Sequence, residues 1–164
     1  MELNIDRNCE NIFALYNPVA IDLRFVLATL KINSNLERIG DFAEGISKVI
    51  ISEKHGFDPE LLKVTRFFEM YQAAINIVQD VLDAFQQENT KLARSTFIKD
   101  EMLDEINMAT NAVIAAYIKE YPERIEQALN ILSIIRKLER VGDHSKNIAE
   151  EIIFYLEAKV LKHN

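Results

Sequence analysis

The chain has 164 residues, with 26 acidic and 19 basic side chains, which gives a formal net charge of −7. This length allows about one compact domain or two small similar halves, so a large multidomain enzyme is excluded. The acidic charge disfavours nucleic acid as a partner. A single cysteine, Cys9, can form neither an internal disulfide nor a multi-cysteine metal site, which favours a reducing compartment, the cytoplasm.

Four glycines and three prolines are few for this length, and scarce turn residues favour a small number of long helices. Within residues 59–87, Phe68, Ile75 and Leu82 recur every seven residues, as on the packed seam of a helical bundle. We therefore predict an all-α, elongated helical bundle. No uncharged apolar stretch is long enough to span a membrane, so any membrane association is expected to be peripheral, through partners. Proline, glycine and polar breaks delimit five predicted helices, over residues 1–16, 19–54, 59–87, 90–120 and 122–162.

Two of these predicted helices contain copies of one hexapeptide. Residues 36–41 read LERIGD and residues 138–143 read LERVGD, so five of six positions are identical at an offset of 102. A glycine inside a helix costs about 1 kcal/mol relative to alanine, so its presence in both copies argues against chance. We infer an internal duplication.

The helix over 19–54 has an apolar column expected to face the core, made of Phe25, Ile32, Ile39 and Ile46. In the adjacent columns, acids replace the aliphatic residues that come earlier in the helix, and the helix over 122–162 shows the same change. The pattern therefore places carboxylates where packing alone would favour leucine.

Each copy carries two acids on one helix face. Glu37 and Asp41, and likewise Glu139 and Asp143, are four residues apart, so each pair converges on one place. Because like charges repel, we expect a cation beside each pair. It would be an arginine, or a metal ion that prefers oxygen ligands, such as Mg²⁺, Mn²⁺, Ca²⁺ or iron.

The predicted helix over 90–120 offers a further pair, Asp100 and Asp104. Four carboxylates facing each other across two helices would suit a metal ion, although a solvated acidic surface has the same spacing. Arg38 and Arg140 project about 100° from the preceding glutamate, so we expect them to bind a partner helix rather than neutralise their own motif.

Three functions are compatible with the residues: a signalling adaptor with metal sites, a carboxylate-bridged metalloenzyme, and a metal-free helical scaffold. The sequence has no Glu-x-x-His pair, phosphate-binding glycine loop or Gly-x-Ser-x-Gly motif. Their absence disfavours a di-iron oxygenase and other enzymes built on these motifs, so we predict a non-enzyme.

The paired hexapeptide, the segment NPVAIDLR at 17–24 and the segment NIAEEI at 147–152 resemble the PhoU family of phosphate-signalling regulators. The resemblance covers nearly the whole chain and implies an all-α fold of two three-helix repeats. It further implies a cytoplasmic, non-enzymatic adaptor that represses the phosphate-starvation response when phosphate is plentiful. Its implied partners are the ATPase of a phosphate ABC transporter and a membrane sensor kinase.

The family's acidic motifs bind metal clusters, with iron in some members, so the resemblance implies metal ions as cofactors. Arg24, within the matching segment 17–24, joins Arg38 and Arg140 as a predicted partner-binding residue. Carried over position by position, the metal ligands would be Glu37, Asp41, Asp100, Asp104, Glu139 and Asp143, with Glu2 and Asp6 as a looser match.

Matching Asn17-Pro18 to the family pattern places Met1 inside the second helix of the first repeat. Residues 1–55 would then be a partial first repeat and residues 58–164 a complete second one, as expected of a shortened chain or a misplaced start codon. The uncovered seam, including Phe25 and Ile32, should then favour a homodimer or higher oligomer.

Overall fold

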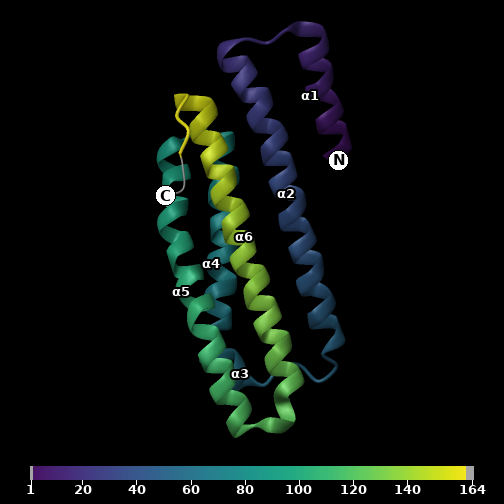
Figure 1. Ribbon diagram of the computed structural model, residues 1–164, viewed down its shortest axis with the longest axis vertical. Coiled ribbons are helices and arrows are strands. Elements are labelled where there is room, and N and C mark those ends of the chain that lie inside the picture. Colours follow the sequence, from purple (N-terminus) through teal and green to yellow (C-terminus); the bar gives the residue numbers. More distant parts are fainter. Residues whose placement is uncertain (1, 162–164) are drawn as a thin grey trace.

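The computed structural model describes residues 2–161, with side chains from residue 3 onward, and it confirms an all-α fold in this part. The long helices lie side by side along one axis, so the molecule is elongated (Figure 1). Within the described part, no helix combines the length and apolar character that crossing a bilayer requires. In chain order the elements are α1 (Glu2–Tyr16), α2 (Ala20–Ser52), α3 (Pro59–Val64), α4 (Phe67–Gln86), α5 (Thr90–Glu120), the 3-10 turn η1 (Pro122–Arg124) and α6 (Ile125–Glu157).

The prediction of one helix over 59–87 is wrong, because the structure breaks it into α3 and α4. Thr65 ends α3 by donating its hydroxyl to the carbonyl oxygen of Leu61 at 2.7 Å. Arg66 then adopts a left-handed conformation with φ 52°, which an α-helix cannot continue. Its guanidinium pairs with Glu69 of α4 at 2.6 Å and with Glu105 of α5 at 2.8 Å, so surface ion pairs within α4 and to α5 accompany the break.

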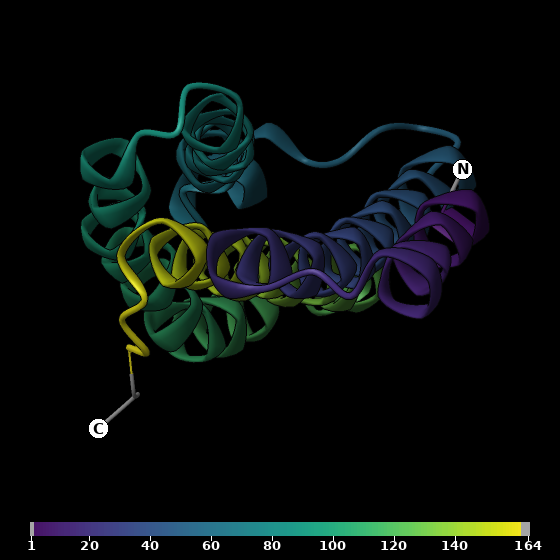
Figure 2. The ribbon, with the colours of Figure 1, turned by 90° about the horizontal axis from the view of Figure 1, so that it is seen from above.

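Helix α6 is the centre of the bundle. Helices α2, α4 and α5 all pack against it, whereas α1 packs against α2. Figure 2 shows that α4 covers one side of the layer that α2 and α6 form. The two copies of the hexapeptide therefore lie on neighbouring helices.

The core consists of two apolar clusters along α6. Both draw buried side chains from at least three helices, which fixes the helices to one another. Fully buried members of the first cluster include Leu61, Met70, Ile77, Leu103, Ile131 and Ile135, and those of the second include Ala28, Val81, Ala93, Ile148 and Ile152.

The apolar column predicted on α2 is buried only in part. Ile32 and Ile46 are buried and Ile39 packs against both clusters, but Phe25 is 45% exposed. The expectation that Ile32 would be exposed is wrong, since only 5% of it is accessible. The reason is that α2 packs along α6, whose Ile148 belongs to the same cluster.

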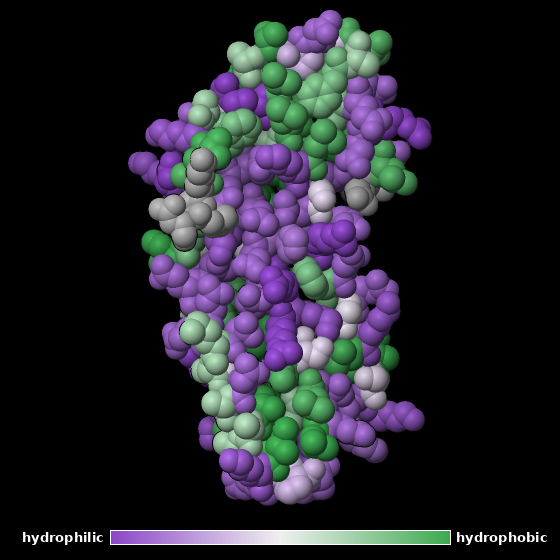
Figure 3. Space-filling view, viewed as in Figure 1, coloured by the Kyte–Doolittle hydropathy of each residue, from purple (hydrophilic) through white to green (hydrophobic). Residues whose placement is uncertain are grey.

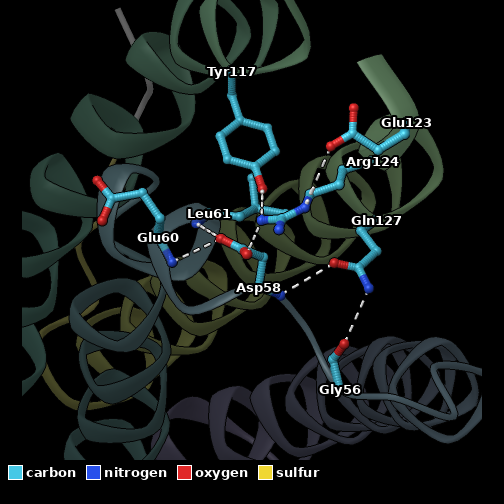
Figure 4. A network of polar contacts seen from close by, with 8 residues as sticks. All are labelled: Gly56, Asp58, Glu60, Leu61, Tyr117, Glu123, Arg124 and Gln127. Carbon is cyan, nitrogen blue, oxygen red and sulfur yellow. Dashed lines mark hydrogen bonds and ion pairs between the residues drawn. The ribbon is translucent and has the colours of Figure 1, made fainter. Parts of the chain in front are cut away.

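A polar network ties the loop between α2 and α3 to the start of α6 (Figure 4). Asp58 caps α3 and forms an ion pair with Arg124, which also donates to the hydroxyl of Tyr117 at 3.2 Å. The side-chain amide of Gln127 bonds the carbonyl oxygen of Gly56 and the backbone N–H of Asp58, each at 3.1 Å. These contacts fix the loop between α2 and α3 against the end of α5 and the start of α6.

Candidate functional site

Asp100 and Lys146 form a largely buried ion pair between α5 and α6. The side chain of Asp100 is 3% exposed and that of Lys146 is 22% exposed. Lys146 Nζ donates to Asp100 Oδ2 at 2.6 Å and lies 3.6 Å from Asp143 Oδ1. Lys146 is therefore a cation beside the acids of the second repeat. Lys146 was not among the predicted site residues, although its position three residues after Asp143 places it on the same helix face.

Gly142 allows Asp100 to lie this deep. A Cβ built on Gly142 would be 2.6 Å from Asp100 Oδ1 and 2.5 Å from Leu103 Cδ1, so any larger residue would displace α5. Asp100 Oδ1 is buried and has no hydrogen-bond partner among the described residues. The repeated glycine thus has a structural purpose in the second copy.

Four carboxylates share this region, and we call Asp100, Asp104, Glu139 and Asp143 the acidic cluster. Burial raises the pKa of Asp100 above its ordinary value, and this effect outweighs the Lys146 ammonium, which lowers it. For the less buried Lys146, burial lowers the pKa, but hydrogen bonding and attraction to the aspartates outweigh it, so its pKa is raised. The pKa of Glu139 is also raised, first by burial and then by Asp143.

The acidic cluster has the ligand chemistry of a site for an oxygen-preferring cation, but not yet its geometry. Carboxylate oxygens from two helices suit Mg²⁺, Mn²⁺ or iron. In the part of the chain that the structure describes, no three His, Cys, Asp or Glu side chains are arranged to hold a metal ion. The Lys146 ammonium lies between Asp100 and Asp143, so a metal ion would have to displace it.

The acids of the first repeat are more exposed. Glu37 and Asp41 lie on α2, with side-chain exposures of 34% and 52%, and Arg38 lies 3.7 Å and 3.5 Å from their carboxylates. Among the described residues, a Cβ on Gly40 would meet no heavy atom within 4 Å beyond its chain neighbours and the backbone of its own helix. The first copy therefore lacks the close cover that α5 gives to the second.

The expectation that Arg38 and Arg140 turn away from their own motifs is wrong. Arg140 repeats the contacts of Arg38, lying 3.6 Å from Glu139 and 3.1 Å from Asp143. A long guanidinium side chain spans the angular offset between adjacent helix positions, which helix geometry alone does not show. Both arginines remain largely exposed, and their predicted role in partner binding stays a prediction.

The remaining predicted residues lie apart from the acidic cluster. Asp6 of α1 accepts a hydrogen bond from Asn33 at 2.9 Å, one helical turn before Glu37. The side chain of Glu2 lies outside the described residues. Arg24 Nε donates to the backbone carbonyl of Tyr155 at 3.2 Å, so it links the start of α2 to the end of α6.

His144 joins the two copies of the motif. Its Nδ1 lies 2.8 Å from Asn35 Oδ1 of α2, and its ring packs against Phe42. Burial lowers the pKa of His144; the charge of Asp143 opposes this effect, whereas the charges of Arg38 and Arg140 add to it. Beside it, Asp143, Lys146 and Asn147 line a cleft of about 390 Å³ together with Arg140. Figure 3 shows hydrophilic residues across the middle of the face that contains α2 and α6.

Glu139→Gln is expected to raise the urea midpoint of unfolding at pH 7. The pKa of Glu139 in the fold is above its ordinary 4.5, so the folded state binds this proton more readily than the unfolded state. The charged form therefore costs stability above the raised pKa. The gain should shrink as the pH falls through that pKa towards 4.5, because the wild-type carboxyl then becomes neutral too. The exposed Glu101→Gln is the control, and a gain at Glu139 that does not change with pH would contradict this origin.

The chain was compared with known families and structures. A sequence model of the PhoU domain matches residues 1–50 and 67–152, which leaves out the end of α2, the following loop and α3. The phosphate-specific transport system accessory protein PhoU homolog 1 of Thermotoga maritima is 34% identical, over 98% of this chain and 70% of its own length. The corresponding PhoU homolog of Pseudomonas aeruginosa is 34% identical, over 99% of this chain and 67% of its own length.

Solved structures give the same result for the fold. The crystal structure of PhoU from Pseudomonas aeruginosa superposes with a TM-score of 0.90 at 33% identity, covering 96% of this chain and 75% of that one. The phosphate transport system regulatory protein PhoU from Streptococcus pneumoniae gives a TM-score of 0.85 at 29% identity, covering 99% and 75%.

Proposed function

The chain belongs to the PhoU family, and from this premise we propose that it is a cytoplasmic, non-enzymatic adaptor between a phosphate ABC transporter and a sensor kinase. Family membership supports a regulatory role in phosphate uptake. The names of the relatives, accessory proteins of a phosphate-specific transport system, support the transporter as partner. The main support for the adaptor role is the duplicated acid–arginine motif on one polar face. Its two copies offer a partner the same arrangement of acidic and basic side chains.

A pull-down on the ATPase of the phosphate transporter and the kinase's cytoplasmic domain tests this proposal. Arg38→Glu/Arg140→Glu should abolish retention, since it reverses the exposed charges of both motifs. Lys63→Glu/Lys91→Glu changes the net charge equally at exposed positions on α3 and α5 and should bind normally. Wild-type protein that is retained no better than a protein with a scrambled sequence would refute the adaptor role.

We also propose that the acidic cluster takes an oxygen-preferring divalent cation, such as iron or Mn²⁺. The supporting observations are the four neighbouring carboxylates, which influence one another electrostatically, and the deep burial of Asp100. A cation bound there would join α5 to α6. It would also change the charge of the polar face that is proposed to bind the partner protein.

A homodimer is proposed through the side of the molecule that α2 and α4 share. Both helices pack against α6, and between them lies a groove of about 380 Å³ whose lining contains no charged side chain. Two of its lining residues on α4, Tyr71 and Ile75, are 42% and 44% exposed, and Phe68 earlier on the same helix is 66% exposed. These side chains form an exposed apolar surface that a second copy of the chain would cover in a two-fold interface.

Ile75→Glu is expected to convert this dimer into a monomer, because it would bury a carboxylate at the centre of an apolar contact. Light scattering at micromolar concentrations measures the mass. Ile98→Glu alters an exposed isoleucine on α5 and should leave the dimer intact. Monomeric wild-type protein in this range would contradict the proposal.

A further inference from the structure

We propose that Lys146 is an internal cation of the acidic cluster, which a divalent cation must displace in order to bind. This inference rests on the cation site of the proposed function. Cation binding would then be an exchange, in which the Lys146 ammonium leaves as the metal ion enters. Lys146 would therefore set the cation concentration at which the site responds.

The ammonium of Lys146 already lies where a bridging cation would bind. Lys146 Nζ contacts Asp100 of α5 at 2.6 Å and Asp143 of α6 at 3.6 Å. These are oxygens from the two helices that a bridging cation would have to join. Arg140 contacts the other oxygen of Asp143 from outside, whereas a divalent ion between Asp100 and Asp143 would lie where the ammonium is, so these two exclude each other.

The burial of Asp100 makes a counter-ion necessary. Its carboxylate is 3% exposed and relies on Lys146 as its ion-pair partner, while its other oxygen has no hydrogen-bond partner among the described residues. A buried carboxylate left without a counter-ion is costly. Lys146 can therefore leave at low cost only when another cation, or a proton on Asp100, neutralises this charge. Its long aliphatic stem allows the ammonium to reach solvent without a change in the backbone.

The two copies of the motif differ at the position of Lys146. The position 102 residues before Lys146 is Glu44, an exposed acid paired with Lys48 on the same helix. The lysine is therefore not part of the duplicated pattern. The first repeat keeps its arginine, Arg38, beside the acids but has no ammonium at the position that corresponds to Lys146. The exchange is thus specific to the second repeat.

Calorimetric titration with Mn²⁺ tests the exchange. Lys146→Met removes the competing charge and keeps the length of the side chain, so it should bind Mn²⁺ at least about tenfold more tightly than wild type. Lys63→Met removes a lysine that is also paired with an acid three residues away, but on α3, and should bind like wild type. If folded Lys146→Met binds Mn²⁺ no more tightly than wild type, the exchange is refuted.

A second measurement needs no variant. Acylation of lysines in the wild-type protein, read by mass spectrometry, should show that Mn²⁺ increases the labelling of Lys146 while that of Lys63 stays constant. Labelling of Lys146 that does not change at saturating Mn²⁺ would overturn the exchange. If neither wild type nor Lys146→Met binds Mn²⁺, the cation site falls together with the exchange. Binding to the transporter ATPase would still test the adaptor role separately.

Discussion

Gly142→Ala is expected to lower the free energy of unfolding by about 2 kcal/mol, within the range measured for overpacked cores. The added Cβ would lie 2.5 Å from Leu103 Cδ1 and 2.6 Å from Asp100 Oδ1. Both neighbours are buried in a close-packed interface, so neither can move aside without displacing α5. Urea denaturation followed by far-UV circular dichroism measures the loss.

Gly40→Ala is the matched control, because Gly40 holds the same position in the other copy of the motif. No heavy atom lies within 4 Å of its Cβ position, so the substitution should raise the free energy of unfolding by up to about 1 kcal/mol through helix propensity. Opposite signs at the two glycines would show that only the second repeat requires close helix approach. Equal losses at both would contradict this difference between the repeats.

Lys146→Met is expected to lower the free energy of unfolding by about 3 kcal/mol, the lower end of the range for breaking a buried ion pair. The lower end applies because Lys146 keeps 22% of its side chain accessible, whereas Asp100 keeps 3%. Asp100→Asn in the same chain removes the stranded charge, so the double variant should recover much of the loss. A double-mutant cycle in urea measures the coupling between the two side chains.

The pH dependence gives an independent check on this pair. Without the ammonium, the pKa of Asp100 should rise further, because the Lys146 charge no longer opposes the effect of burial. The folded state then binds the proton more readily, so the deficit of Lys146→Met should shrink as the pH falls below 7. The pair contributes little to stability if the effects of the two single substitutions on the free energy of unfolding simply add in the double variant. The same holds if the loss of unfolding free energy in Lys146→Met does not vary with pH.

Most helix boundaries could be predicted from local chemistry. Asn17-Pro18 and Tyr121-Pro122 interrupt helices wherever they occur, because proline restricts the preceding residue and removes a donor. The break at Thr65 and Arg66 carries no such signal. It coincides with a left-handed residue, Arg66, whose guanidinium reaches Glu105 of α5, and such a long-range contact forms only in the folded chain.

The candidate site shows the same division between local and long-range information. The four-residue spacing of Glu139 and Asp143 follows from helix geometry and could be predicted. The depth of Asp100 could not, because it depends on how closely α5 approaches Gly142. The spacing of three residues could place Lys146 beside Asp143, but its buried ion pair with Asp100 depends on how α5 packs and could not be predicted.

The two copies of the motif are nearly identical in sequence but differ in the residues that surround them. Arginine contacts to the acids are the same in both, whereas the buried aspartate, the close glycine contact and the lysine occur only between α5 and α6. Cation binding is therefore proposed for the second copy alone, whereas both copies present matched exposed charge.

Equilibrium dialysis against Mn²⁺, followed by elemental analysis, tests the central claim that the acidic cluster binds a divalent cation. Wild-type protein should retain Mn²⁺ in stoichiometric amount, and Asp104→Asn/Asp143→Asn should lose it while remaining folded, because it removes two carboxylate ligands of the same site. Equal retention by the two proteins, or none by wild type, would contradict the claim.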